Sequence, residues 1–305
     1  MAQLKSNGLD IEYDTFGDPK ADPMLLIMGL GTQMIAWPPA FCHALAEAGH
    51  FVVRFDNRDV GLSTKLDGVR APGTVRFLLH RIFGLSLRAP YTLEDMAADA
   101  VGVLDALGIA AAHVVGASMG GMVAQLVAAS HPVRVKTLTS IMSSSGDPDL
   151  PGPRPEIRKH LFSGRPKSSS MEDLIAYVLE SFRLLMSPEY PRTDEELRPL
   201  IAESLARSHY PEGFKRQVAA IVADGSRAER LSSVRAPTLV IHGKEDPLIP
   251  VDAGFRTALH VRGAKLELID GMGHDLPPRL LAPIAAMIVR HASTRTTPPE
   301  PPARP

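Results

Sequence analysis

Cysteine is almost missing from this sequence: among 305 residues there is one, Cys42. A single thiol makes neither an internal disulfide nor a site built from several thiolates, so disulfide-stapled and zinc-finger-like scaffolds are excluded. The same scarcity favours a reducing compartment. The stretch 1–17 also lacks the apolar core of a secretion signal. The two absences together predict a cytoplasmic protein.

Long apolar runs and an excess of charge are missing too. The longest apolar tract, 101–117, is broken by Asp105, Gly108 and His113, which predicts a helix end followed by a strand and no membrane span. The formal net charge of −1 gives no reason to expect nucleic acid as a partner. No nucleotide-binding glycine pattern and no cluster of metal ligands occurs, so we expect no cofactor and no metal. A small neutral molecule is the favoured partner, and the oligomeric state, monomer or homodimer, stays open.

Short apolar runs alternate with helical patterns, which is typical of a mostly parallel sheet flanked by helices. Strands are predicted at 24–28, 51–55, 112–117, 135–142, 237–243 and 265–270, and helices at 39–49, 92–107, 118–131, 252–259 and 280–291. Between 143 and 231 an irregular stretch leads into three helical patterns without a strand. We therefore expect an α/β core in two parts, 1–142 and 232–293, a helical cap over 143–231, and a disordered proline-rich tail over 294–305.

The glycines Gly116 and Gly120 flank Ser118 in a G-x-S-x-G pattern, directly after a predicted strand and at the start of a predicted helix. In that position the pattern predicts a tight turn that presents the serine as a nucleophile at the carboxyl edge of the sheet. The alternative is a serine that only caps the helix. A base and an acid are needed to decide between the two interpretations.

The favoured base is His274, because the glycine-rich loop that holds it follows the last predicted strand and so reaches the same edge of the sheet. The favoured acid is Asp246, in the loop after the preceding strand; its neighbour Glu245 is not excluded by spacing. His242 ends a strand at this edge, and we assign it a structural role. The order serine, aspartate, histidine is the one expected for an α/β-hydrolase. With all three present, the interpretation as a helix cap alone loses most of its support.

Attack on a carbonyl also requires two donors for the oxyanion. One is predicted to be the backbone N–H of Met119, which follows the nucleophile. The other is expected from the glycine-containing loop after strand 24–28, where we choose the N–H of Leu30. The alternative for this loop is that Gly29 and Gly31 only make a turn.

Several stretches resemble the α/β-hydrolase superfamily, and within it the aclacinomycin methylesterase branch. They are FGDPKADPMLLIMGLG, AWPPAF, VVRFDNRDVGLST, VVGASMGG, APTLVIHGKEDPLIP and GMGHDLP, within 9–288. The resemblance implies an α/β-hydrolase fold with a helical cap after the sixth strand, and it implies Ser118, Asp246 and His274 as nucleophile, acid and base. It gives the loop of Asp56, Arg58 and Asp59 no catalytic role. The segment 68–92 is longer than expected and is either an extra surface helix or a second lid.

The predicted activity is hydrolysis of carboxylic esters through an acyl-enzyme on Ser118. The same three residues also serve lactonases, thioesterases, carbon–carbon bond hydrolases and perhydrolases, and a non-catalytic ligand receptor is the alternative of another class. In the cap, apolar residues recur every three or four positions over 171–187. We expect part of this stripe, Phe182, Leu185 and Met186, to line an apolar cleft for bulky substrates; packing in the core is the alternative.

Overall fold

The computed structural model describes residues 1–73, 75–77, 79, 85–163 and 170–294. Apart from Thr294, the tail predicted to be disordered lies outside these residues. The segment 68–92 is described only in part, so neither its helix nor its lid interpretation is decided.

Eight strands form one sheet in the order β1-β2-β4-β3-β5-β6-β7-β8. Their bounds are β1 Ala2–Ser6, β2 Leu9–Phe16, β3 Asp22–Ile27, β4 His50–Phe55, β5 Ala112–Ala117, β6 Val135–Ile141, β7 Thr238–Gly243 and β8 Lys265–Ile269. In the order of the sheet, each strand from β4 to β8 is parallel to its neighbour. Strand β1 is antiparallel to β2, and β2 is antiparallel to β4. The six strands predicted from apolar runs are all present. β1 and β2 go beyond them, because a half-exposed edge hairpin has no continuous apolar run.

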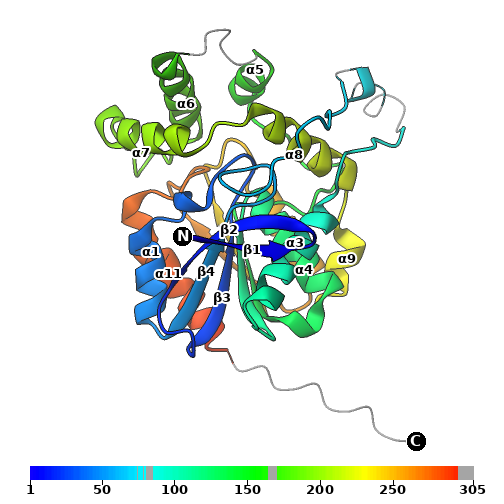
Figure 1. The fold of residues 1–305 in the computed structure, drawn as a ribbon, viewed down its shortest axis with the longest axis vertical. Coiled ribbons are helices and arrows are strands. Elements are labelled where there is room, and N and C mark those ends of the chain that lie inside the picture. Colours follow the sequence, from blue (N-terminus) through cyan, green and yellow to red (C-terminus); the bar gives the residue numbers. More distant parts are fainter. Residues whose placement is uncertain (74, 78, 80–84, 164–169, 295–305) are drawn as a thin grey trace, which may run out of the picture.

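Helices cover both faces of the sheet (Figure 1). Helices α1 (Pro39–Glu47) and α11 (Pro278–Ala292) lie on one face, and α3 (Leu93–Ala106), α4 (Met119–Ser130) and α9 (Ala228–Ser232) lie on the other. Helix α10 (Asp252–His260) packs beside α9 and β7. The short 3-10 helices η1 (Met34–Ala36) and η2 (Pro132–Arg134) follow β3 and α4. This is the α/β-hydrolase architecture that the sequence predicts.

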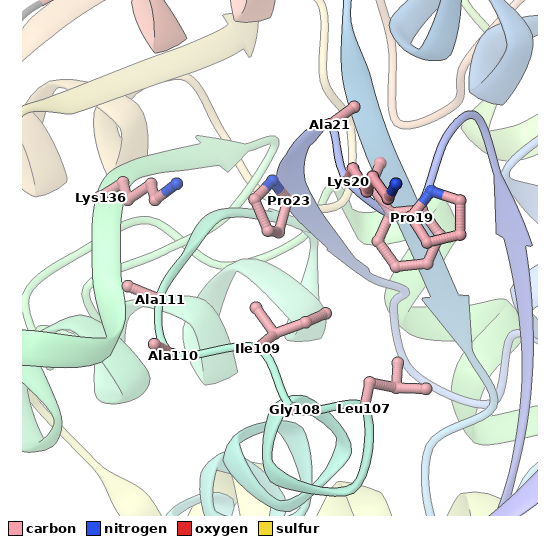
Figure 2. A pocket seen from close by; sticks show the side chains of 11 residues that line it. Pro19, Lys20, Ala21, Pro23, Leu107, Gly108, Ile109, Ala110, Ala111 and Lys136 are labelled. Atoms are coloured by element: carbon pink, nitrogen blue, oxygen red, sulfur yellow. The ribbon is translucent and has the colours of Figure 1, made fainter.

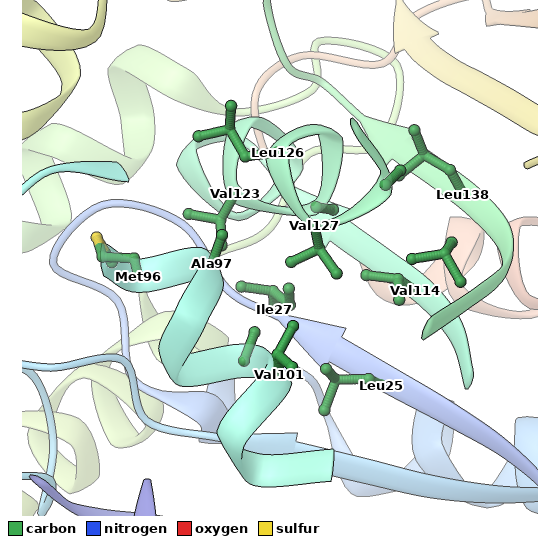
Figure 3. Packing of buried hydrophobic residues seen from close by; sticks show 14 of the residues in the cluster. Leu25, Ile27, Met96, Ala97, Val101, Val114, Val123, Leu126, Val127 and Leu138 are labelled. Atoms are coloured by element: carbon green, nitrogen blue, oxygen red, sulfur yellow. The ribbon is translucent and has the colours of Figure 1, made fainter. Parts of the chain in front are cut away.

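The two apolar clusters explain why the central strands read as continuous apolar runs. Leu25, Ile27 and Val114 pack against α3 and α4 on one face (Figure 3). The alternate residues Leu26 and Val115 belong to the cluster on the other face. Because both faces of these strands are buried, most of their positions are apolar. The sheet is therefore a rigid base for the loops at its carboxyl edge.

Four further helices lie together beyond one end of the sheet, between β6 and β7 in the chain (Figure 1). They are α5 (Pro155–Ser163), α6 (Met171–Leu185), α7 (Asp194–Arg207) and α8 (Pro211–Asp224). A capping box of Thr193 and Glu196 starts α7. Helices α6 and α7 have a small apolar cluster of their own, built from Ile175, Leu179, Leu197 and Ile201. Among the residues described between β6 and β7 there is no strand.

Candidate active site

The backbone at Ser118 takes a conformation that L-residues rarely adopt, with φ of +55°. It follows β5 directly and precedes the first turn of α4. A Cβ at Gly116 would lie 2.1 Å from the carbonyl oxygen of Gly120, and a Cβ at Gly120 would lie 2.1 Å from that of Ile27. Only glycine fits at these two positions. The strained turn is the geometry expected of a nucleophile elbow, and the side chain of Ser118 makes no capping bond to α4.

A histidine and an aspartate line up with this serine. Ser118 Oγ lies 3.0 Å from His274 Nε2, and His274 Nδ1 lies 2.7 Å from Asp246 Oδ2. The other carboxylate oxygen of Asp246 accepts hydrogen bonds from the backbone N–H groups of Leu248 and Ile249, at 2.9 and 2.8 Å. Its side chain is fully buried. The carboxylate is therefore fixed, and it can orient the imidazole and stabilise its positive charge.

The neighbouring carboxylate Glu245 is not part of this hydrogen-bonded set. Among the described residues no hydrogen bond or ion pair joins it to His274, and its Oε2 is buried without a hydrogen-bond partner. Its backbone N–H donates to the carbonyl of Met272. Of the two acids that spacing allows, Asp246 is the one beside the histidine.

A second histidine, His242, lies near Asp246. Its Nε2 is 2.8 Å from the carbonyl oxygen of Ile249 and 3.6 Å from Asp246 Oδ2. Burial lowers the pKa of His242, although Asp246 acts in the opposite direction. A neutral imidazole that donates to Ile249 leaves the charge of Asp246 available to His274. This position agrees with the structural role predicted for His242.

The two predicted oxyanion donors lie on segments next to the nucleophile. Met119 opens α4, and Leu30 lies in the loop after β3. A Cβ at Gly29, next to Leu30, would lie 3.1 Å from Ser118 Cβ, so this loop passes directly beside the serine. Within the described part of the chain, neither the N–H of Met119 nor that of Leu30 donates a hydrogen bond. Neither donor is therefore used by another described residue, as an oxyanion hole requires.

The three residues predicted to bind substrate differ in position. The carbonyl oxygen of Leu185 accepts a hydrogen bond from the N–H of His274 at 2.8 Å, and the backbone of Met186 packs on Gly273. The end of α6 therefore lies beside the histidine loop. Phe182, one turn earlier, is 36% exposed.

Sequence reasoning missed two residues that hold the histidine loop. Ser187 Oγ accepts the N–H of Gly273 at 2.9 Å, and the N–H of Ser187 donates to Asp275 at 3.0 Å. Burial raises the pKa of the Asp275 carboxyl. Asp275 follows His274 in the chain, but the contact with Ser187 joins positions 88 residues apart. A local pattern contains no signal for such a pair.

The opposite edge of the sheet holds a group of metal-ligand types. Ligand atoms of Asp22, His50 and His113 lie within 4.8 Å of one another. His113 Nε2 is 3.0 Å from Asp22 Oδ2, and Lys136 pairs with the other oxygen of that carboxylate. Lysine thus supplies the cation that this carboxylate needs, and we assign no metal there. The hollow in Figure 2, lined by Pro19, Lys20, Ala21, Pro23, Phe51, 107–111 and Lys136, lies at the same edge, away from Ser118.

Comparison with known proteins agrees with this fold. A family model described as the alpha/beta hydrolase fold matches residues 22–277. The chain is an α/β hydrolase. Rhodomycin D methylesterase DnrP from Streptomyces peucetius is 32% identical to this hydrolase over 300 residues, covering 92% of this chain and 94% of the relative.

More distant relatives have other activities in their names. A 2-hydroxy-6-oxononadienedioate/2-hydroxy-6-oxononatrienedioate hydrolase from Paraburkholderia phymatum is 28% identical, over 87% of this chain and 85% of the relative. Among solved structures, a meta-cleavage product hydrolase from Pseudomonas fluorescens has a TM-score of 0.74 at 21% identity, covering 95% of this hydrolase and 97% of that chain. An enol-lactonase from Burkholderia xenovorans has a TM-score of 0.71 at 22% identity, covering 95% and 99%. These two structures support the fold alone. In the described part of this hydrolase, no helix has the length and apolar character that crossing a membrane requires.

Proposed function

We propose that this hydrolase cleaves carboxylic esters through an acyl-enzyme on Ser118. The observation that carries the proposal is the hydrogen-bonded line from Ser118 through His274 to a buried Asp246. A serine hydroxyl is a weak nucleophile at neutral pH, and a base within hydrogen-bond reach removes that barrier. The methylesterase relative, similar over most of both chains, supports an ester as the substrate.

The reaction follows from the positions of these groups. Ser118 Oγ attacks the carbonyl carbon of the ester while His274 Nε2 takes the proton of the serine hydroxyl. The N–H groups of Leu30 and Met119 bind the oxyanion, and the imidazolium then gives the proton to the leaving alcohol. Water, activated by the same imidazole, attacks the acyl carbon and releases the acid and the free serine.

We further propose that α5–α8 form the cap, within the range 143–231 that the sequence predicts, and that the substrate is apolar and bulky. The end of α6, at Leu185 and Met186, contacts the loop of His274, so this helix reaches the reacting groups. Flexible methionine and aromatic side chains suit large apolar groups. Phe182 contributes at the exposed rim of such a cleft.

Location is the remaining part of the proposal. We expect the protein in the cytoplasm, since a chain with a single cysteine makes no disulfide within itself and such scarcity is typical of reducing compartments. That thiol, Cys42, is buried.

A fluorophosphonate probe followed by a panel of methyl and p-nitrophenyl esters tests the function. We expect stoichiometric labelling at Ser118 and turnover of apolar esters. Labelling without turnover of any ester would favour the receptor alternative. Turnover of lactones or carbon–carbon substrates, with none of esters, would favour the activities named for the more distant relatives.

A further inference from the structure

One buried glutamine of α8 contacts the loop that carries the predicted oxyanion donor. Gln217 is fully buried. Its Oε1 accepts a hydrogen bond from the backbone N–H of Gly31 at 2.8 Å, and its Nε2 donates to the carbonyl oxygen of Arg58 at 2.9 Å. Because the first partner can only donate and the second can only accept, the orientation of the amide is fixed. Both ends of the side chain are thus used.

The contact falls on the central peptide of a tight turn. The N–H of Thr32 donates to the carbonyl oxygen of Gly29, so 29–32 form a turn with Leu30 and Gly31 at its centre. Gly31 has φ of +63°, and a Cβ there would lie 2.7 Å from the ring of Phe214. Glycine allows this turn to change conformation easily. The bond from Gly31 to Gln217 restrains the peptide that joins Leu30 to Gly31.

Helix α8 is itself held against the sheet next to this contact. The guanidinium of Arg216 makes two hydrogen bonds of 2.8 Å to Asp59, and both side chains are almost completely buried. An anchored helix therefore presents Gln217 to the 29–32 turn. The turn is also held by bonds from Thr32 Oγ1 to the carbonyl oxygen of Leu30 and from Asn57 to that of Met28.

We infer that Gln217 is a positioning residue: it holds the 29–32 turn so that the N–H of Leu30 faces the oxyanion formed at Ser118. This inference rests on the proposed function. It places part of the oxyanion site under the control of the cap, since a displacement of α8 would release the turn. One misplaced donor weakens binding of the transition state more than binding of the substrate.

Gln217→Met tests the inference, because methionine keeps the length of the side chain and removes both hydrogen bonds. All constants are expressed per active site, titrated with the fluorophosphonate probe, so that unfolded protein does not count. We expect kcat for a p-nitrophenyl ester to fall about tenfold or more, below the hundredfold or greater loss of a whole donor, with KM changed less than about threefold. Binding of phenylboronic acid, whose tetrahedral adduct places an oxygen in the hole, should weaken in parallel.

Gln125→Met is the matched control. Gln125 is also fully buried and makes two side-chain hydrogen bonds, to Ser140 and from Arg227, neither of which touches the 29–32 turn. It should lose stability and keep kcat per site. Gln217→Glu retains an acceptor for Gly31, so it should keep more of kcat than Gln217→Met.

The inference is wrong if folded Gln217→Met keeps wild-type kcat and boronic acid affinity, or if both methionine variants lose them equally. It is also wrong if only KM changes, or if Gln217→Glu is no better than Gln217→Met. Failure of the proposed function would give a different result: the wild-type protein itself would neither react with the fluorophosphonate probe nor hydrolyse an ester.

Discussion

The nucleophile elbow and the helical segment α5–α8 are held in place by different kinds of contact. The elbow is built from neighbours in the chain and lies between two large apolar clusters. The helical segment has a small apolar cluster of four buried residues in α6 and α7. Among the described residues of this segment, only α8 adds a buried residue, Ala220, to a large cluster on the sheet, and polar pairs supply further contacts with the loops of the sheet. Arg207 pairs with Asp56, Arg216 pairs with Asp59, and Ser187 bonds the histidine loop.

This difference indicates a division of roles. The apolar sheet fixes the serine, whose position must not vary, because close packing permits few alternatives. The stabilisation from a buried polar pair depends on the distance and direction between its two groups, and it is lost when one partner is removed. The loops around the serine are therefore the part of the site that substitutions in the helical segment should change.

The largest expected effect on activity comes from a substitution in the nucleophile elbow. Ser118→Ala should reduce ester turnover about a thousandfold or more, because the covalent route is lost, while the thermal midpoint stays near that of the wild type. Turnover is measured on purified protein after chromatography that removes any contaminating esterase. Near-native turnover would show that Ser118 is not the nucleophile.

A smaller but still large effect is expected from the acid. Asp246→Asn should lower kcat about a hundredfold or more, because the imidazole loses the partner that fixes its tautomer. Glu245→Gln, the adjacent control, should change kcat less than about threefold, since no hydrogen bond or ion pair joins Glu245 to His274 in the described structure. Equal losses in two folded variants would mean that the geometry around His274 has been assigned to the wrong carboxylate.

The polar junction is tested by stability. Burial alone would raise the pKa of Asp59, but hydrogen bonds from Arg216 and Leu66 keep it below its usual range, so the carboxylate is charged. Arg216→Met leaves that charge buried and should lower the free energy of unfolding by about 3 kcal/mol in a denaturant titration. Arg198→Met breaks a pair with Glu172 on the surface and should cause no measurable change. Similar denaturation midpoints for both variants would contradict the importance of the junction.

The smallest expected effect is a change of kcat/KM with the length of the substrate's acyl chain. If the helical segment covers an apolar cleft, kcat/KM for p-nitrophenyl esters should rise from acetate to a maximum between butyrate and octanoate. Each buried methylene should add up to about 0.8 kcal/mol until the cleft is full. The series is measured at one pH up to decanoate. A steady fall from acetate would mean a small pocket and would remove the argument for bulky substrates.

The fold and the reacting residues could be predicted because their signals are local. A strand buried on both faces is a continuous apolar run, and the elbow requires glycine at fixed distances from Ser118. Strands β1 and β2 were not predicted, because a partly exposed hairpin at one side of the sheet contains polar residues that interrupt any apolar run. The choice between Asp246 and Glu245 depends on which way each side chain leaves its loop, and spacing does not contain that information.

By itself, the sequence determined the chain order of six of the eight strands and of the helices between them, the elbow at Ser118, and the two loops that bring Asp246 and His274 to the same edge of a parallel sheet. These follow from steric and hydrophobic requirements that act within a few residues. Only the tertiary structure decided which distant polar groups meet: Gln217 and Gly31 are 186 residues apart, and Arg216 and Asp59 are 157 apart. A buried hydrogen bond depends on direction and on distances of a few tenths of an ångström. The packed chain fixes those quantities, and no pattern along the sequence records them.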